Sequence, residues 1–239
     1  MWTDVVDLRD FYGESLGRLA ARLLRRRIRE LWPEAKGENL LGIGYATPYL
    51  RPFLEDAQRV LAVMPAGQGV LRWPADQPNA VALADEDQLP FPDLSMDRIL
   101  LVHALEFSEQ VRSMLREVWR VLSDRGRLLV VVPNRRGLWA QLERTPFGHG
   151  HPYTALQLSR LLRDNLFTPL RTATALHVPP IRSRMLLSVA GAWEQVGDRW
   201  LQTFAGVVLI EAAKEIYAAN LARERRRKRR VYVPVPGGL

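Results

Sequence analysis

The sequence predicts an α/β protein with a doubly wound, mostly parallel sheet, and two observations favour this fold class. First, short runs rich in Val, Leu and Ile recur at 39–43, 59–64, 79–83, 96–102 and 127–132. Uninterrupted apolar runs of this length are typical of strands that are buried on both faces. Second, the segment between the last two runs has one apolar helical face: Val111, Met114, Leu115, Val118, Val121 and Leu122. The order strand, helix, strand implies a parallel sheet.

An amphipathic helix is expected before the first strand. Leucine and isoleucine recur at helical spacing from Leu16 to Leu31, arginines fill the other face, and Pro33 closes the segment. A helix lying on a membrane surface would look similar. Such helices more often carry Trp or Phe on the apolar face, so we expect this one to pack on the domain.

After the fifth strand, three further elements are expected. Thr154 and Gln157 form a capping box before a leucine-rich helix. The run 168–178 is typical of an edge strand, stopped by Pro179 and Pro180. The segment from Gly206 to Ile210 has strand composition, and the alanines that follow favour a helix, so we expect a strand running into a helix.

The composition excludes several classes of protein. With 239 residues and 47% hydrophobic content, the chain can form one substantial core. No apolar run is long enough for a membrane span, and the first residues are acidic rather than typical of a secretory signal. We therefore expect a cytoplasmic protein. The chain has no cysteine, which excludes disulfides and cysteine-ligated zinc.

The net charge of +8 is concentrated near the C-terminus. Residues 223–230 carry seven positive and one negative side chain, and thus supply +6 of the total. We expect 223–239 to be a solvated basic tail. A contact with nucleic acid or another anionic surface is the alternative, although no aromatic residues are interleaved with the arginines as a stacking surface would require.

Two long segments resemble a known family. They are "ADEDQLPFPDLSMDRILLVHALEF" and "LREVWRVLSDRGRLLVVVPNRRGLW". Together they are similar to the class I S-adenosylmethionine-dependent methyltransferases, in particular the type 11 domain branch, over about 39–167. The resemblance implies a seven-stranded Rossmann-like sheet, with S-adenosylmethionine bound where the parallel strands end.

In that family, an acidic residue and three alternating glycines follow the first strand. Gly42, Gly44, Ala46 and Pro48 stand at those four positions here, so only Gly44 matches. A glycine lets the backbone approach a ligand closely, whereas proline fixes φ and removes a donor. The resemblance places Gly42, Gly44, Tyr45, Ala46 and Thr47 in the cofactor site.

The resemblance also assigns cofactor contacts after the next strands. Met64 stands where the family usually has an acid for the ribose hydroxyls. Losing such a charge-assisted hydrogen bond weakens binding by roughly tenfold to a hundredfold. Asp85 matches the family's contact to the adenine amino group, with Glu86 beside it and the "LPF" turn following. A solvated acidic turn is the alternative reading.

Methyl transfer from a sulfonium is a direct displacement, so alignment of the reactants can supply most of the catalysis. A general base helps only where the acceptor must lose a proton. The candidates are His103 and Glu106 after the fourth strand and Asn134 after the fifth, and His103 is also a candidate cofactor contact. The segment "HALE" can equally be a helix start whose Glu faces water.

Residues of a possible acceptor lid follow the fifth strand. They are Trp139, His149, His151 and Tyr153, and the last three lie in "TPFGHGHPYT". The His-x-His spacing can bind a metal, but no third ligand is evident nearby, so we expect no metal. An ordered loop whose imidazoles satisfy backbone groups is the alternative.

These observations lead to one main hypothesis and one rival. We expect a single methyltransferase-like domain over 1–222: a helical segment at 1–34, a cofactor-binding half at 39–134 and an acceptor or lid half at 135–222. It would transfer a methyl group to a small-molecule or macromolecular acceptor. The rival is a catalytically inactive scaffold that binds a partner. The sequence does not name the acceptor.

Overall fold

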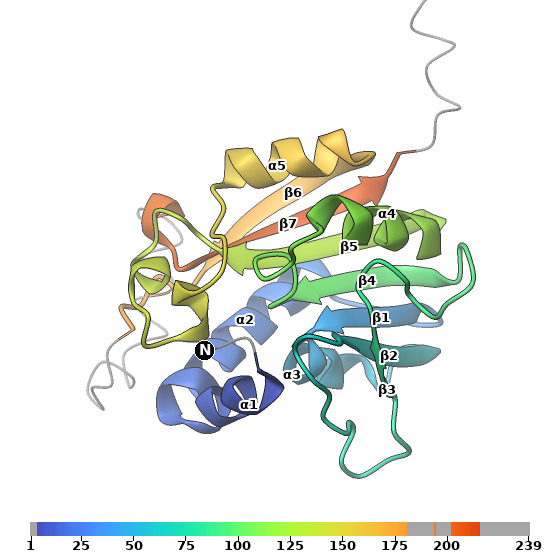
Figure 1. Ribbon diagram of the computed structural model, residues 1–239, viewed down its shortest axis with the longest axis horizontal. Coiled ribbons are helices and arrows are strands. Elements are labelled where there is room, and N and C mark those ends of the chain that lie inside the picture. The colour runs from blue at the N-terminus through green and yellow to red at the C-terminus, as the bar shows by residue number, and fades with distance from the viewer. Residues whose placement is uncertain (1–3, 181–193, 195–201, 216–239) are drawn as a thin grey trace, which may run out of the picture.

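The computed structural model describes residues 4–180, 194 and 202–215, and its centre is a seven-stranded sheet (Figure 1). The strand order is β3-β2-β1-β4-β5-β7-β6. The strands β1 to β5 are parallel to one another, whereas β7 runs antiparallel to both β5 and β6. The strands are β1 (Asn39–Gly44), β2 (Arg59–Pro65), β3 (Val81–Ala84), β4 (Met96–Val102), β5 (Leu122–Pro133), β6 (Phe167–Ala175) and β7 (Val207–Lys214).

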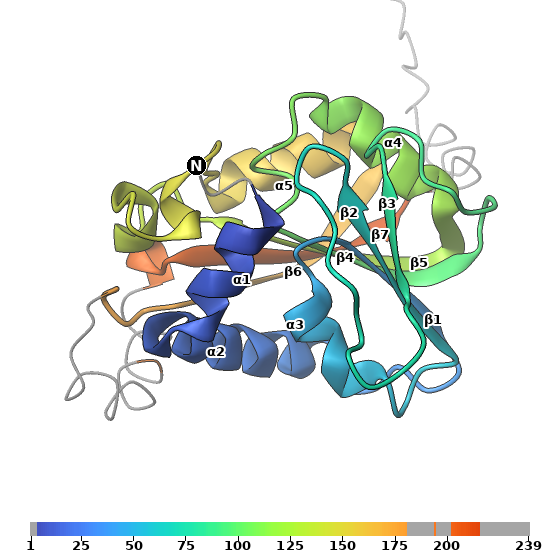
Figure 2. The same ribbon diagram turned by 60° about the horizontal axis from the view of Figure 1, so that its bottom comes forward.

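Helices cover both faces of the sheet, so the molecule has three layers (Figure 2). One face carries α1 (Val5–Gly13), α2 (Ser15–Leu31) and α3 (Thr47–Leu50), and the other carries α4 (Val111–Val121) and α5 (Ala155–Asp164). Short 3₁₀ turns complete the chain: η1 (Arg51–Phe53), η2 (Leu138–Gln141), η3 (Pro146–Gly148) and η4 (Gln202–Phe204). The expected doubly wound, mostly parallel sheet is confirmed.

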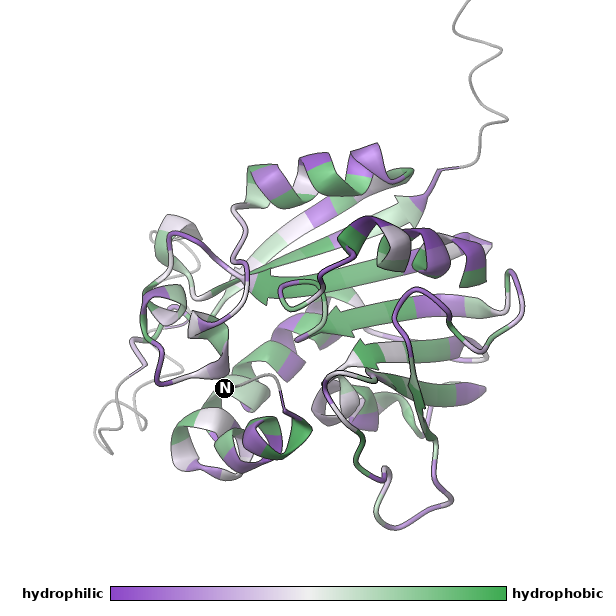
Figure 3. Cartoon of the chain, viewed as in Figure 1, coloured by the Kyte–Doolittle hydropathy of each residue, from purple (hydrophilic) through white to green (hydrophobic). Residues whose placement is uncertain are grey.

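Successive side chains of the central strands pack alternately on the two faces of the sheet. Leu40, Leu100 and Leu129 pack with α1 and α2, whereas Leu41 and Ile99 pack with α4 and α5. Because side chains alternate along a strand, a strand buried on both faces must be apolar throughout. Figure 3 shows the central strands as continuous hydrophobic bands.

Several expected elements are confirmed. The helix at 111–121 forms, and α5 begins with the capping box, in which Thr154 and Gln157 each bond the other's backbone N–H. The strand with Pro169 is the edge strand β6. The amphipathic helix α2 ends at Leu31, shortly before Pro33.

One helix was not expected as a separate element, and two expectations need correction; the part of the expected C-terminal helix beyond residue 215 lies outside the described residues. A separate helix, α1, precedes α2, and Asp4 caps it by accepting from Val6 N–H. Strand β5 begins at Leu122, directly after α4, because Leu122 already pairs with Met96 of β4. Strand β7 extends through Glu211 to Lys214 rather than becoming a helix there. It is hydrogen-bonded on both sides, and such pairing overrides the helical preference of its alanines.

Two of the sequence-based expectations concern a membrane span and the basic tail. In the described part of the chain, no helix has the length and apolar character needed to cross a membrane. The basic segment 223–230 lies outside the described residues.

Candidate functional site

The parallel strands bring four loops to one edge of the sheet. Strands β1, β2, β3 and β4 end at Gly44, Pro65, Ala84 and Val102 respectively. The chain leaves β1 toward β2 on one side and later returns to β4 on the other side. The carboxyl ends of β1 and β4 therefore form the switch point where open α/β sheets bind their ligands.

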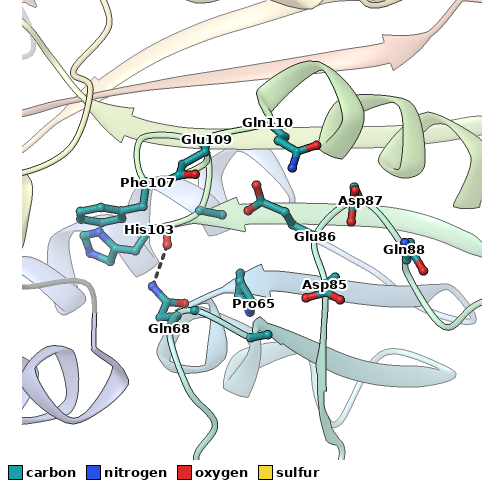
Figure 4. Close-up of a pocket in the computed structure, with 13 residues that line it drawn as sticks. Pro65, Gln68, Asp85, Glu86, Asp87, Gln88, His103, Phe107, Glu109 and Gln110 are labelled. Atoms are coloured by element: carbon teal, nitrogen blue, oxygen red, sulfur yellow. Dashed lines mark hydrogen bonds between the residues drawn. The ribbon is translucent and has the colours of Figure 1, made fainter.

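A cavity of about 580 Å³ opens at this edge. Figure 4 shows it between the ends of β2 and β3 and the segment that follows β4. Its lining residues are Pro65, Ala66, Gly67, Gln68, Asp85, Glu86, Asp87, Gln88, His103, Ala104, Phe107, Glu109 and Gln110. Three of the predicted site residues, Asp85, Glu86 and His103, are thus brought together.

The cavity is rich in hydrogen-bond acceptors. Asp85, Glu86, Asp87 and Glu109 all contribute carboxylates. Gln68 donates from Nε2 to the carbonyl oxygen of His103 at 3.0 Å (Figure 4), while its own Oε1 is buried and has no hydrogen-bond partner within the described part of the chain. Such a lining favours a ligand that brings donors or positive charge.

Helix α4 fixes the turn that carries Asp85. Arg120 holds Glu117 with two hydrogen bonds of 2.9 and 2.7 Å, and also donates to the carbonyl oxygens of Leu89 and Phe91. Glu117 in turn accepts from Leu89 N–H. The hydrogen bonds from Arg120 lower the pKa of Glu117 and keep it charged. The "LPF" turn is therefore anchored at both its carbonyl and its amide groups.

The loop after β1 does not line this cavity. Gly44 has φ +81°, and a Cβ there would clash with the carbonyl oxygens of Val102 and His103. Gly42 is enclosed by Leu50 and Ala46. Position 44 therefore requires glycine because its backbone lies very close to the end of β4. Tyr45, Ala46 and Thr47 are buried as well.

A chain of buried polar side chains closes this end of the site. Tyr49 donates from its hydroxyl to Tyr12 Oη at 2.8 Å, and Tyr12 lies 2.8 Å from His103 Nε2. His103 Nδ1 lies 3.2 Å from Glu106 Oε1. With a neutral imidazole protonated at Nδ1, every link has one donor and one acceptor. Tyr12 comes from α1 and is also stacked on Tyr45, with ring centroids 5.4 Å apart.

Burial shifts the titration of these tyrosines. Desolvation raises the pKa of Tyr12, with further contributions from Tyr49 and Glu106, and it raises the pKa of Tyr45 to about 12. The hydroxyl groups of both tyrosines are therefore protonated and neutral at physiological pH. Glu106 is 1% exposed, and its Oε2 has no hydrogen-bond partner among the residues that the structure describes.

The expected lid residues Trp139, His149, His151 and Tyr153 are not among the residues that line the cavity. Trp139 is buried, donates to the carbonyl oxygen of Val178 and packs edge-on against Phe147, whose ring lies 5.0 Å from that of His103. His149 Nε2 contacts the carbonyl oxygen of Glu143.

His151 and Tyr153 are connected with Glu106. The backbone N–H of His151 donates to the carbonyl oxygen of Glu106. The half-buried Tyr153 has a raised pKa, caused by desolvation and then by the charge of Glu106. Among the described residues there is no group of three or more potential ligands that could hold a metal ion.

Two further candidates serve the backbone instead of the cavity. Asn134 donates both amide hydrogens, to the carbonyl oxygens of Thr203 and Ala205. It thereby ties the end of β5 to the segment before β7. Met64 is fully buried, and its sulfur accepts from Leu71 N–H.

Sequence reasoning missed Tyr12, Tyr49 and Gln68. The first sits in the unanticipated helix α1, whose apolar positions Val5, Leu8 and Phe11 recur at three-residue spacing. That spacing and the N-cap Asp4 were the available signals. Nothing local marked Gln68, because its partner is a backbone carbonyl thirty-five residues away.

Comparison with known proteins identifies the central segment. Residues 41–130 match the family model described as a methyltransferase domain. This segment runs from β1 into β5 and contains every residue that lines the cavity. This part of the chain is similar to a methyltransferase domain. The cofactor that this family indicates is S-adenosylmethionine.

Curated relatives extend the match without adding a function. An uncharacterised protein of Mycobacterium tuberculosis is 29% identical over 144 residues, which cover 57% of this chain and 48% of that protein. A protein of Mycobacterium bovis, also uncharacterised, matches equally well. The chain spans about half the length of the curated relatives it matches.

Solved structures share the fold of the methyltransferase domain. A SAM-dependent methyltransferase from Thermotoga maritima has a TM-score of 0.61 at 17% identity, covering 88% of this chain and 96% of that one. A Burkholderia thailandensis N1-methyltransferase with bound S-adenosylhomocysteine has a TM-score of 0.53 at 16% identity, covering 87% and 82%. A [4+2]-cyclase has a TM-score of 0.56 at 22% identity, covering 82% and 81%. The fold itself therefore does not specify the reaction.

Proposed function

We propose that this protein binds S-adenosylmethionine in the cavity at the ends of β2, β3 and β4 and transfers its methyl group to an acceptor. The supporting observation is that the whole lining of the 580 Å³ cavity falls within the segment matched by the methyltransferase family. The cavity lies beside the switch point of the sheet, at the ends of β2, β3 and β4, and Asp85 is among its lining residues.

The cavity residues suit the adenosine portion of the cofactor. Asp85 can accept a hydrogen bond from the adenine amino group. Gln68 Oε1 in the cavity lining is a buried acceptor without a partner among the described residues, and the ammonium group of the cofactor would supply a donor. When bound, S-adenosylmethionine supplies an activated methyl group.

His103 is the residue best placed to act as a general base. Glu106 contacts Nδ1 and stabilises an imidazolium, while Nε2 contacts Tyr12. A shift of Tyr12 would free Nε2 to take a proton from the acceptor. The acceptor's lone pair would form the new bond to the methyl carbon as the carbon–sulfur bond breaks and its electron pair stays on sulfur. An acceptor that has no proton to lose needs only alignment.

Isothermal titration calorimetry with S-adenosylmethionine and S-adenosylhomocysteine tests the cofactor assignment. We expect saturable binding of both, weakened about tenfold to a hundredfold by Asp85→Asn, because one charge-assisted hydrogen bond is lost. Asp164→Asn, an exposed acid at the end of α5, is the matched control and should bind as the parent does.

One observation favours a second function, that of a partner-binding scaffold without catalysis. The cavity does not reach the β1 loop, where Tyr12 and Tyr45 are stacked and buried. A scaffold needs no space there. Absence of heat with either compound at millimolar concentration would support this function and reject methyl transfer.

A further inference from the structure

A second cavity, of about 520 Å³, lies between α1 and α2 and is strongly basic. Four arginines line it, namely Arg9, Arg18, Arg22 and Arg25, and none of the lining residues in the described part of the chain carries a carboxylate. Figure 2 shows α1 and α2 side by side beneath the sheet. This cavity is separate from the one that contains Asp85, because the two share no lining residue.

The position of the arginines follows from helix geometry. Arg18, Arg22 and Arg25 are spaced by four and three residues, so their side chains emerge from one face of α2. Like charges at this spacing destabilise a helix. Among the described residues, none of these three forms an ion pair that would offset the repulsion. Arg9 pairs with Asp10, which is outside the lining.

Part of the basic lining is held in place. Arg25 donates from Nε and Nη2 to the carbonyl oxygen of Pro48, at 3.2 and 3.0 Å. The stacked rings of Tyr12 and Tyr45 form an aromatic wall of the same cavity. The wall is buried, whereas Arg9, Arg18 and Arg22 are exposed. Arg18 donates to the carbonyl oxygen of Gly13, which also lines the cavity.

We propose that this cavity binds a phosphate group of a phosphorylated compound. A guanidinium is planar and presents paired N–H donors that match phosphate oxygens, and several of them around one concave space neutralise a multiply charged anion. The anion would also remove the repulsion along α2. The cavity has the volume of a small-molecule site. This proposal does not depend on methyl transfer.

The test is titration calorimetry of the full chain with inorganic pyrophosphate, without S-adenosylmethionine. We expect saturable binding that the double variant Arg18→Gln/Arg22→Gln weakens by about tenfold or more. The matched control is Arg26→Gln/Arg116→Gln, which removes the same charge from two exposed positions outside the cavity. The control should bind as the parent does.

Vesicles distinguish a free phosphate compound from a lipid headgroup. Phosphatidylcholine vesicles with and without phosphatidic acid are sedimented with each variant. Binding that needs phosphatidic acid and is lost in the Arg18/Arg22 variant indicates a lipid headgroup, whereas pyrophosphate binding alone indicates a free compound. Equal losses in both double variants, or no saturable binding to either probe, would overturn the proposal.

Discussion

At the scale of single residues, Gly44 has two separate reasons to be glycine. Its φ of +81° lies in the left-handed region, and the backbone of β4 leaves no space for a Cβ. Gly37 has a similar φ of +74°, but no atom lies within 4 Å of the position that a Cβ would occupy, so it carries the first constraint alone. Substitutions at Gly37 and Gly44 can therefore distinguish the energetic cost of backbone strain from the cost of a steric clash.

Alanine substitutions at these two glycines should differ in cost. We expect Gly37→Ala to lower the free energy of unfolding by about 1–2 kcal/mol, the cost of a left-handed L-residue. Gly44→Ala should lose about 1–3 kcal/mol more, because atoms of β4 must shift. Urea denaturation of both variants measures the difference. Equal losses of unfolding free energy would show that the contact between the β1 loop and β4 does not restrict the size of residue 44.

The role of a residue could be predicted from the sequence in two cases only. Its partner lies close to it in the chain, or it belongs to a long segment that matches a family pattern. Asp85 is predictable because the turn around it matches a family pattern, and the structure places it in the cavity. The link between Tyr12 and His103 joins residues ninety-one positions apart. Contacts between residues so far apart in the chain depend on how the layers pack, so they cannot be predicted from the type of either residue alone.

At the scale of elements, strands buried on both faces were the most predictable. The apolar runs of β1, β2 and β4 allow no other placement in a layered fold. Strand β7 was harder to delimit, because its alanines have no strand preference and are held by hydrogen bonds to β5 and β6. Helix α1 was missed because it is short and only weakly amphipathic.

The contact between α4 and the "LPF" turn predicts a pH-dependent stability. The pKa of Glu117 is lowered from 4.5, first by hydrogen bonds from Arg120. A depressed carboxyl pKa contributes stability above the unfolded-state pKa, and that contribution is lost as the pH falls through the folded-state value. Glu117→Gln should therefore be less stable than the parent at neutral pH, with the gap narrowing below pH 4.5.

Urea denaturation of the parent and Glu117→Gln across this range gives the gap directly. At each pH the two proteins are compared under the same conditions, so titration of the other carboxyl groups largely cancels. A gap that stays constant from neutral pH down to about pH 3 would mean that the charge of Glu117 contributes nothing.

At the scale of the whole molecule, α1 connects the two cavities. Tyr12 forms part of the wall of the basic cavity and also contacts His103, which lines the acidic one. The three-layer fold places α1 over the end of the sheet, where Phe11 also meets Phe147 of η3. Access to the β1 loop from the cavity that contains Asp85 thus requires movement of α1, of η3 or of both.

This arrangement predicts the effect of cofactor binding on α1, on the basis of the proposed function. The amino acid portion of S-adenosylhomocysteine needs space beside the β1 loop, and Tyr12 and Tyr45 now fill that space. We expect saturating S-adenosylhomocysteine to speed amide hydrogen exchange in residues 5–13, because the buried contacts of Tyr12 and Phe11 are broken. Helix α5 has no residue in either cavity and is the internal control.

The opposite results have distinct meanings. Saturated binding with unchanged exchange in α1 would place the amino acid portion of the ligand elsewhere and leave Tyr12 as a fixed wall. His103 Nε2 would then stay occupied by Tyr12, and His103 could not serve as the general base. Faster exchange in both α1 and α5 would indicate general destabilisation, since ligand binding to the native state must stabilise the fold overall.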